Sequence, residues 1–137
     1  MSKRALVLIG VLGALAVGLG AFGAHGLKNQ LAGGLITVDQ LNGFDTGVKY
    51  QMYHTLAMLV VFLLSQKKEN RYFKLSWYFF LIGILLFSGS LYFLTTRNLY
   101  NADFLKVLGP VTPIGGLFFL LGWIMFIPAA YSKEKED

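Results

Sequence analysis

Two histidines stand in or beside long apolar runs, and they are the side chains there best suited to bind a ligand or carry a proton. His25 closes the first run, and His54 lies within the second. Since a neutral imidazole can ligate haem iron, one hypothesis is a haem-binding redox subunit that uses both side chains as axial ligands. However, each predicted helix supplies only one histidine, and His25 is placed too near the membrane surface to face His54 across a haem. We therefore predict no cofactor and no metal site.

The acidic residues argue against catalysis. All seven lie in predicted loops or in the tail, and they are Asp39, Asp45, Glu69, Asp103, Glu134, Glu136 and Asp137. No carboxylate is left inside the apolar runs for acid–base catalysis, proton pumping or metal binding. The absence of cysteine excludes disulfides, zinc–thiolate sites and iron–sulfur clusters. The segment GPVTPIGG, residues 109–116, lacks the Lys-Ser/Thr ending of a phosphate-binding loop. We predict that the protein is not an enzyme.

Polar side chains gather toward one end of the apolar runs. Tyr50, Gln51 and His54 are spaced three or four residues apart, so they share one face of a helix. Polar groups inside a membrane need partners on other helices, and the natural partners are on the third run. One interpretation is a hydrogen-bonded layer that packs the helices. The other is a site for a lipid headgroup or small amphiphile, with Lys28, Lys49, Arg97 and Lys106 around its mouth. The candidate binding residues are His25, Lys28, Lys49, Tyr50, Gln51, His54, Ser88, Ser90, Tyr92 and Arg97.

Small residues predict where helices pack closely. Gly10, Ala14 and Gly18 have small-xxx-small spacing, which lets helix backbones approach each other in lipid. Because the first helix has small residues on more than one face, we expect it to sit centrally or to contact a neighbouring subunit of a homo-oligomer. Trp123 falls near mid-depth, where its indole N–H needs a carbonyl or hydroxyl partner. The predicted packing residues are Gly10, Ala14, Gly18, Gly20, Gly89, Gly115, Gly116 and Trp123.

These side chains require helices that cross a membrane. Hydrophobic residues make up 55% of the 137-residue chain, and they are concentrated in four runs of roughly the 17–25 residues that span a bilayer. We predict an all-α membrane protein, with four transmembrane helices in one compact bundle, at about residues 5–24, 48–65, 75–96 and 113–131. Backbone groups in hydrocarbon must be satisfied within each segment, which is why the runs are helical. The charged tail is residues 132–137.

The first run has a second interpretation, as a secretory signal. It starts with basic residues, and Ala21-Phe22-Gly23 resembles a cleavage site. The run is longer than the usual apolar segment of a signal, roughly 7–15 residues, so we favour an uncleaved helix.

The loop predicted at residues 26–46 contains Thr37-Val38-Asp39-Gln40, which fits a capping box. It is either a surface loop or a short interfacial helix between the first two spans.

The basic residues predict the orientation. The net charge of +5 would suit nucleic acid, but the cations lie in the gaps between apolar runs, so we predict membrane lipids as partners and no nucleic acid. Four cations fall on one side of a four-span protein: Lys28, Lys49, Arg97 and Lys106. Eight fall on the other side: Lys3, Arg4, Lys67, Lys68, Arg71, Lys74, Lys133 and Lys135. Both termini are therefore predicted to be cytoplasmic in a cell (inner) membrane.

Four ordered motifs carry a resemblance to a known family. They are GAFGAHGLK (20–28), FDTGVKYQMYHTLAML (44–59), LFSGSLYFL (86–94) and GPVTPIGGLFFLLGW (109–123). Together they resemble the small membrane family catalogued as domain of unknown function 423, which also has eukaryotic relatives. The resemblance spans nearly the whole chain and implies a multi-pass inner-membrane protein of bacterial type, without supplying an activity. Gly47, Lys49 and Thr55 depart from the residues most common in the family.

A third functional hypothesis is an oligomeric transporter or channel. Gly115 and Gly116 follow Pro113, and this sequence can form a broken helix end that admits a substrate. The absence of an acidic residue inside the spans argues against coupled transport by one subunit. Sequence alone leaves the substrate and the biological process open.

Overall fold

Four long helices form the protein. The structure is a computed structural model that describes residues 1–67 and 69–132. Among these residues, four apolar helical segments are long enough to cross a membrane: Lys3–Ala32, Val38–Lys67, Arg71–Tyr100 and Asp103–Tyr131. An α-helix of 30 residues is about 45 Å long, against about 30 Å for the hydrocarbon core, so the helices tilt or extend into the headgroup layers. The all-helical, four-span fold predicted from sequence is confirmed.

The first segment is one continuous helix with a π turn in it. It consists of α1 (Lys3–Phe22), the π turn η1 (Gly23–Leu27) and α2 (Lys28–Ala32). A π turn holds an extra residue, and such turns are frequent at functional sites. His25 therefore lies inside a helix rather than at the end of one. The prediction that the helix ends at residue 24 was wrong, because α2 carries polar residues that hydropathy assigns to a loop.

The second segment starts ten residues earlier than predicted. Its helix, α3 (Val38–Lys67), begins at the predicted capping box, which is confirmed. The Gln40 N–H donates to Thr37 Oγ1 over 3.2 Å, and the Thr37 N–H donates to Gln40 Oε1 over 2.9 Å. The predicted outer loop at 26–46 was wrong, because only residues 33–37 connect the two helices. There is no separate interfacial helix between the first two spans in the described chain.

The remaining helices are interrupted by short irregular turns. The third segment comprises α4 (Arg71–Gly83), the π turn η2 (Ile84–Ser88), α5 (Gly89–Thr96) and the 3₁₀ turn η3 (Arg97–Tyr100). The fourth comprises the 3₁₀ helix η4 (Asp103–Leu108), α6 (Val111–Ile124) and α7 (Phe126–Tyr131). The predicted break around Pro113 and Gly115 was wrong: α6 runs through both, because Pro113 lies in the first turn, where a helix needs no N–H donor.

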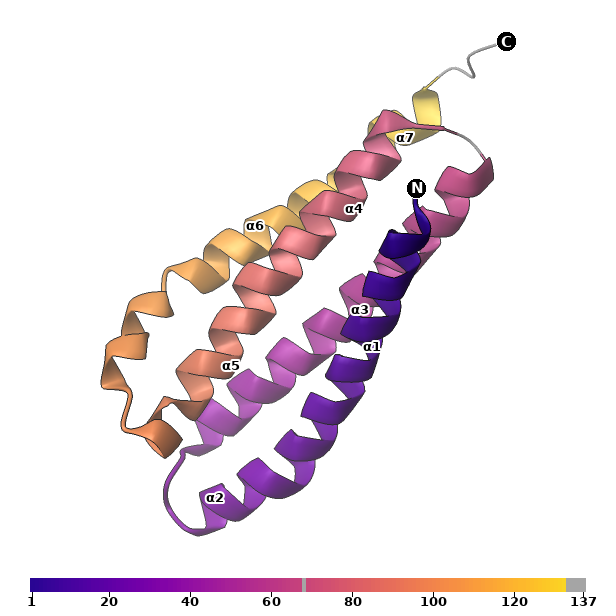
Figure 1. Ribbon diagram of the computed structural model, residues 1–137. Helices are drawn as coiled ribbons and strands as arrows, with labels where there is room; N and C mark the ends of the chain where they lie inside the picture. The colour runs from indigo at the N-terminus through magenta and orange to yellow at the C-terminus, as the bar shows by residue number, and fades with distance from the viewer. Residues whose placement is uncertain (68, 133–137) are drawn as a thin grey trace.

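The helices pack in the order in which they follow one another along the chain. α1 packs chiefly against α3, α3 packs against α4 and α5, and α6 packs against α4 and η2 (Figure 1). The start of α1 and the short helix α7 lie at one end of the bundle, which we call the terminal end; α2, η3 and η4 lie at the opposite, distal end (Figure 1). Lys68, Lys133 and Lys135, which contributed to the orientation count, lie outside the described residues, as does the tail beyond Ser132.

The first helix lies at an edge of the bundle. The prediction that it sits centrally was wrong, because only one face of α1 meets the rest of the chain. Nothing lies within 4 Å of a Cβ built on Gly10 or Gly18, and Ala14 between them is exposed. The opposite face supplies Ile9, Leu12 and other residues to the main core. Contact of the small-residue face with a neighbouring subunit stays a prediction.

Candidate functional site

A buried glutamine joins three helices near the middle of the bundle. Gln51 on α3 is 3% exposed, and its amide N–H donates to the Leu12 carbonyl of α1 over 2.8 Å. Its amide oxygen accepts from the Tyr92 hydroxyl of α5 over 2.7 Å. Thr55 Oγ1 in turn donates to the Gln51 carbonyl over 2.7 Å. Both ends of the amide are therefore used to hold α1 and α5 against α3.

His54 has both ring nitrogens engaged. It is 5% exposed, and Nδ1 lies 2.7 Å from the Tyr50 carbonyl, which can only accept a hydrogen bond. Nε2 lies 3.2 Å from Trp123 Nε1, which can only donate. The imidazole is therefore neutral with its proton on Nδ1. Its ring stacks on Phe119 with centroids 3.5 Å apart and an interplanar angle of 6°, so the side chain joins α3 to α6.

A pair of hydroxyl groups joins α5 to α6. Ser90 Oγ lies 2.7 Å from Thr112 Oγ1, and Ser90 also donates to the Phe87 carbonyl. Ser88, one of the candidate binding residues on the third run, is fully buried, and its hydroxyl has no hydrogen-bond partner among the described residues. We call the residues that make these interhelical bonds the polar layer: Leu12, Gln51, His54, Ser90, Tyr92, Thr112 and Trp123.

The polar layer lies deeper than sequence predicted. His54 is sixteen residues after the first residue of α3 and thirteen before the last, so it is close to the middle of that helix. The expected position near the outer surface was wrong, because it assumed a helix that starts at residue 48. The terminal half also carries interhelical hydrogen bonds that sequence reasoning missed. Ser76 donates to the Gly122 carbonyl over 2.8 Å, and Asn70 donates to the Ala129 carbonyl over 3.1 Å. The hydroxyl of Ser76, isolated in an apolar run, was the available sign.

Close packing of α6 against the third segment positions the layer. A Cβ on Gly115 would overlap the backbone of Phe87, so only glycine permits this approach. Gly83 and Gly122, which sequence reasoning missed, lie in the same way against the rings of Phe119 and Phe80. Among the predicted packing glycines, a Cβ built on Gly116 would make ordinary contact with Phe87, and one built on Gly20 with Val48. A Cβ built on Gly89 would have nothing within 4 Å.

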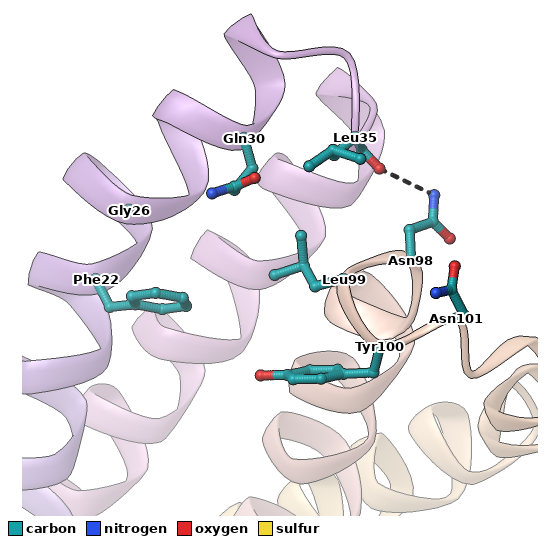
Figure 2. A pocket seen from close by; sticks show the side chains of 8 residues that line it. All are labelled: Phe22, Gly26, Gln30, Leu35, Asn98, Leu99, Tyr100 and Asn101. Carbon is teal, nitrogen blue, oxygen red and sulfur yellow. Dashed lines mark hydrogen bonds between the residues drawn. The ribbon is translucent and has the colours of Figure 1, made fainter.

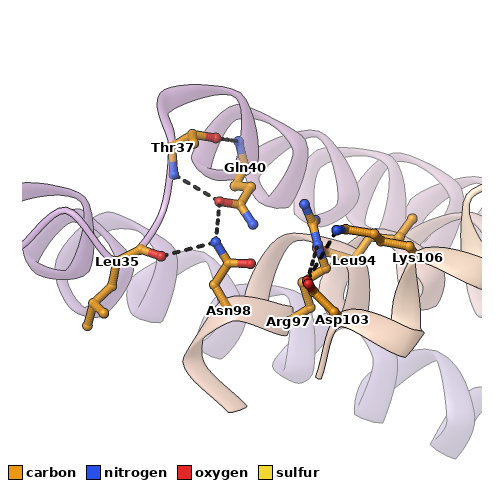
Figure 3. A network of polar contacts seen from close by, with 8 residues as sticks. All are labelled: Leu35, Thr37, Gln40, Leu94, Arg97, Asn98, Asp103 and Lys106. Atoms are coloured by element: carbon orange, nitrogen blue, oxygen red, sulfur yellow. Dashed lines mark hydrogen bonds and ion pairs between the residues drawn. The ribbon is translucent and has the colours of Figure 1, made fainter. Parts of the chain in front are cut away.

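The cations predicted to surround a binding site are mostly paired with aspartates. Lys49 Nζ lies 2.6 Å from an oxygen of Asp45. Arg97 and Lys106 both approach Asp103, at 3.9 and 3.3 Å (Figure 3). Arg97 also donates to the Leu94 carbonyl. Three of the four predicted cations therefore share two aspartates, which leaves less positive charge than the sequence suggested, and a basic mouth around a binding site stays a prediction. The fourth cation, Lys28, is exposed on α2.

The predicted haem ligands do not fit a haem. The lone pair of His54 Nε2 accepts the Trp123 indole N–H, and Nδ1 carries the proton given to the Tyr50 carbonyl. His25 is exposed on η1, toward the distal end. His54 therefore serves to join helices, and His25 lies apart from the polar layer. The part of the chain that the structure describes also holds no group of three or more His, Cys, Asp and Glu side chains arranged to bind a metal.

A groove opens at the distal end, between η1, α2 and η3. Its volume is about 420 Å³, within the roughly 300–1,000 Å³ typical of small-molecule sites. Phe22, Leu35 and Leu99 supply its apolar surface. The amide of Gln30 lines the groove from α2, and the amides of Asn98 and Asn101 line it from the opposite side (Figure 2). The lining residues carry no charge, and they are Phe22, Gly26, Gln30, Leu35, Asn98, Leu99, Tyr100 and Asn101.

Asn98 ties this groove to the start of α3. Its amide N–H groups donate to the Leu35 carbonyl over 3.3 Å and to Gln40 Oε1 over 3.4 Å (Figure 3). Gln40 is the capping-box residue, and its own amide nitrogen is buried without a partner among the described residues. Asn101 adopts a left-handed backbone conformation with φ of 51°, which turns the chain at the edge of the groove.

Known proteins similar to this chain are membrane proteins. The profile of the family described as "Protein of unknown function (DUF423)" matches residues 19–116. A UPF0382 membrane protein of Haemophilus influenzae is 44% identical over 135 residues, covering 98% of this chain and 99% of the relative. The UPF0382 membrane protein YwdK of Bacillus subtilis is 40% identical over 130 residues, covering 93% and 96%. A UPF0382 membrane protein of Staphylococcus aureus is 40% identical over 129 residues, again covering 93% and 96%. No solved structure matches the chain.

Proposed function

We propose a non-enzymatic role for this chain, which belongs to the DUF423 family of membrane proteins. In this role the distal groove receives a lipid headgroup or small amphiphile. The polar layer then has the structural task of holding the bundle that shapes the groove. The protein resides in the cell membrane with both termini in the cytoplasm, so that the groove faces the outer headgroup layer. The basic residues support this orientation.

The pairing within the polar layer supports a packing role for it. Gln51 and His54 use their side-chain polar atoms on Leu12, Tyr92, Tyr50 and Trp123, so neither has a free group for a ligand or a reaction. A catalytic base needs a proton acceptor that can reach the substrate. The only buried imidazole in the described residues does not offer one, which supports a non-enzymatic role.

The groove at Asn98 is the observation that carries the proposal. Amide side chains from Gln30, Asn98 and Asn101 stand on the same groove as the apolar surface of Phe22 and Leu99. A molecule with a hydroxylated or zwitterionic head and an apolar chain matches this combination, because amides both donate and accept hydrogen bonds. The 30-residue helices bring the groove beyond the hydrocarbon core, to the depth of lipid headgroups.

A photoreactive monoacylglycerol in nanodiscs tests the proposal. We expect labelling of the segments that contain Phe22 and Leu99, mapped by mass spectrometry. Gln30→Leu removes an amide while keeping a side chain of similar size. Asn101→Gly also removes an amide, and glycine adopts the left-handed backbone conformation at this position without strain. Combined, these changes reduce labelling about fivefold, as expected for about 1 kcal/mol of lost hydrogen bonding.

Asn29→Leu provides the matched control, because Asn29 is exposed on α2 and does not line the groove. It should leave the labelling unchanged. Equal labelling of all variants, or equal loss in the control, would contradict the proposal.

A further inference from the structure

A second cleft opens at the terminal end, between the first turns of α1 and α4. Its volume is about 460 Å³. Both helices pack against α3, and the cleft opens where α1 and α4 do not pack closely against each other. Arg4 and Leu8 line the cleft from α1, and Lys74, Trp77, Tyr78 and Leu81 line it from α4. This cleft is separate from the polar layer and from the distal groove.

The cleft presents two cations without an acidic partner. Arg4 and Lys74 are both exposed, and the described residues include no ion pair or hydrogen bond to either side chain. At the distal end, by contrast, Arg97 and Lys106 both approach Asp103, while Lys28 is exposed on α2. Two positive charges facing one cleft repel each other, and an anion between them would relieve the repulsion.

Along the helix axes the cleft changes from charged to apolar, as a phospholipid changes from its headgroup to its acyl chains. Arg4 and Leu8 are four residues apart, so they lie one above the other on α1. On α4, Lys74 and Tyr78 are related in the same way, with Leu81 further from the end of the helix. Both walls therefore carry charge at the membrane surface and apolar surface deeper in the bilayer.

A buried donor at the same cleft lacks a partner. Trp77 is 5% exposed, and its indole nitrogen has no hydrogen-bond partner among the described residues. Buried indole N–H groups ordinarily find an acceptor. The oxygens of a bound headgroup would supply one to Trp77.

We propose that this cleft binds an anionic phospholipid of the leaflet at the terminal end. Arg4 and Lys74 contact its phosphate, Trp77 donates to an oxygen of the headgroup, and an acyl chain lies along Leu8 and Leu81. The complementary charge selects the anionic lipid over a zwitterionic one. The site is independent of the distal groove, whose lining residues are uncharged.

Native mass spectrometry of the full chain tests the site. The protein is released from nanodiscs that contain phosphatidylglycerol and phosphatidylcholine in equal amounts, and the retained lipids are counted. We expect the wild type to retain phosphatidylglycerol preferentially, and Arg4→Gln combined with Lys74→Gln to lower that preference about tenfold. Lys3→Gln combined with Lys67→Gln removes the same charge from exposed positions at the same end that do not line the cleft. An equal loss in this control would overturn the proposal, as would a wild type without preference.

Fluorescence gives a second measurement that leaves the charges intact. Trp77 and Trp123 are the only tryptophans in the sequence, so Trp123→Phe isolates the emission of Trp77. We expect phosphatidylglycerol with brominated acyl chains to quench Trp77 more strongly than brominated phosphatidylcholine at the same mole fraction. Equal quenching by the two lipids would overturn the proposal even if the charge variants fail to fold.

Discussion

The two tryptophans occupy opposite situations. Trp123 is 50% exposed, yet its indole N–H donates to His54 over 3.2 Å. Trp77 is 5% exposed, yet its indole N–H has no partner among the described residues. Burial of a donor without an acceptor is costly, so the more buried of two donors is ordinarily the one with a hydrogen-bond acceptor. The Trp123 indole is thus satisfied within the chain and the Trp77 indole is not, which agrees with the phospholipid site proposed at Trp77.

Two pairs of cations, one at each end of the bundle, show a similar contrast. At the distal end, Asp103 lies near both Arg97 and Lys106. At the terminal end, Arg4 and Lys74 share a cleft without an acidic residue in its lining. Two cations that share a carboxylate are partly neutralised within the chain, whereas two cations without one have the chemistry to bind an anion. The following predictions, in order of decreasing effect, test this distinction.

The largest effect is expected where α6 meets η2. Gly115→Ala places a Cβ on the backbone of Phe87, which cannot move aside as a flexible side chain can. We expect α6 to shift away from η2, the hydrogen bond between Trp123 and His54 to break, and the free energy of unfolding to fall by at least about 2 kcal/mol. Steric-trapping measurements in bicelles would report the change. Gly116→Ala is the control, since its Cβ would lie 3.8 Å from Phe87, and a large destabilisation there would refute the packing argument.

The next effect is expected at the glutamine that joins three helices. Gln51→Leu removes the bonds to Leu12 and Tyr92, and it should lower the unfolding free energy by about 1–2 kcal/mol, since interhelical bonds in membranes contribute about 1 kcal/mol each. A double-mutant cycle with Tyr92→Phe checks the pair. Tyr92→Phe should cost much less in the Gln51→Leu background than in the wild type. Full additivity would mean that the two side chains do not act together.

A smaller effect is expected at the tryptophan of the polar layer. Trp123→Phe leaves His54 Nε2 without its donor, and we expect the unfolding free energy in detergent to fall by about 0.5–1 kcal/mol. Nitrogen NMR of the imidazole should find the proton on Nδ1 in the wild type. A proton on Nε2 would show that the Trp123 bond does not form.

The corresponding change at the other tryptophan should reduce the stabilisation that lipid provides. Added phosphatidylglycerol should raise the melting temperature of the wild type and of Trp123→Phe equally, because a ligand that binds the folded state stabilises it. For Trp77→Phe the stabilisation by lipid should shrink by about 0.5 kcal/mol, the contribution of one hydrogen bond. Undiminished stabilisation of Trp77→Phe would place the lipid elsewhere.

The smallest effect on stability is expected on the free face of α1. Gly10→Leu fills open space, so the unfolding free energy should change by less than about 0.5 kcal/mol. The sequence also predicts that this face meets a second copy of the chain, and in that case the same substitution should abolish an oligomer detected by native mass spectrometry. A stable variant of unchanged oligomeric mass would assign this face to lipid.

Hydropathy predicted the four spans but not their ends. Uncharged apolar runs identify the part of each helix inside hydrocarbon. Residues 38–47, which contain two aspartates, are too polar for that criterion, although the capping box at Thr37 indicated where the helix starts. Because the start of α3 was predicted ten residues too late, Gln51 and His54 were predicted to lie nearer the membrane surface than they do. Capping residues mark where a helix begins, whereas apolar runs mark only its part inside the bilayer. The two give different boundaries here because the helices extend beyond the bilayer core.

The members of the polar layer were predicted better than their partners. Helical spacing placed Gln51 and His54 on one face, but the rotation of the neighbouring helices decides which group they meet. Tyr92 bonds to Gln51, whereas Ser90 bonds to Thr112 instead. The Leu12 carbonyl was invisible to any residue pattern, since every residue has one. The terminal cleft was missed because Arg4 and Lys74 looked like ordinary flanking cations until α1 and α4 were placed side by side.

The packing of the helices in chain order has a consequence for biogenesis. Each membrane-spanning helix docks chiefly on the helix synthesised just before it, so the bundle can assemble as the ribosome delivers it, hairpin by hairpin. The bond of His54 to Trp123 and its stacking on Phe119, by contrast, reach across from α3 to α6. That junction cannot form until translation has passed Trp123, so helices delivered early are joined to α6 only late in the maturation of the protein.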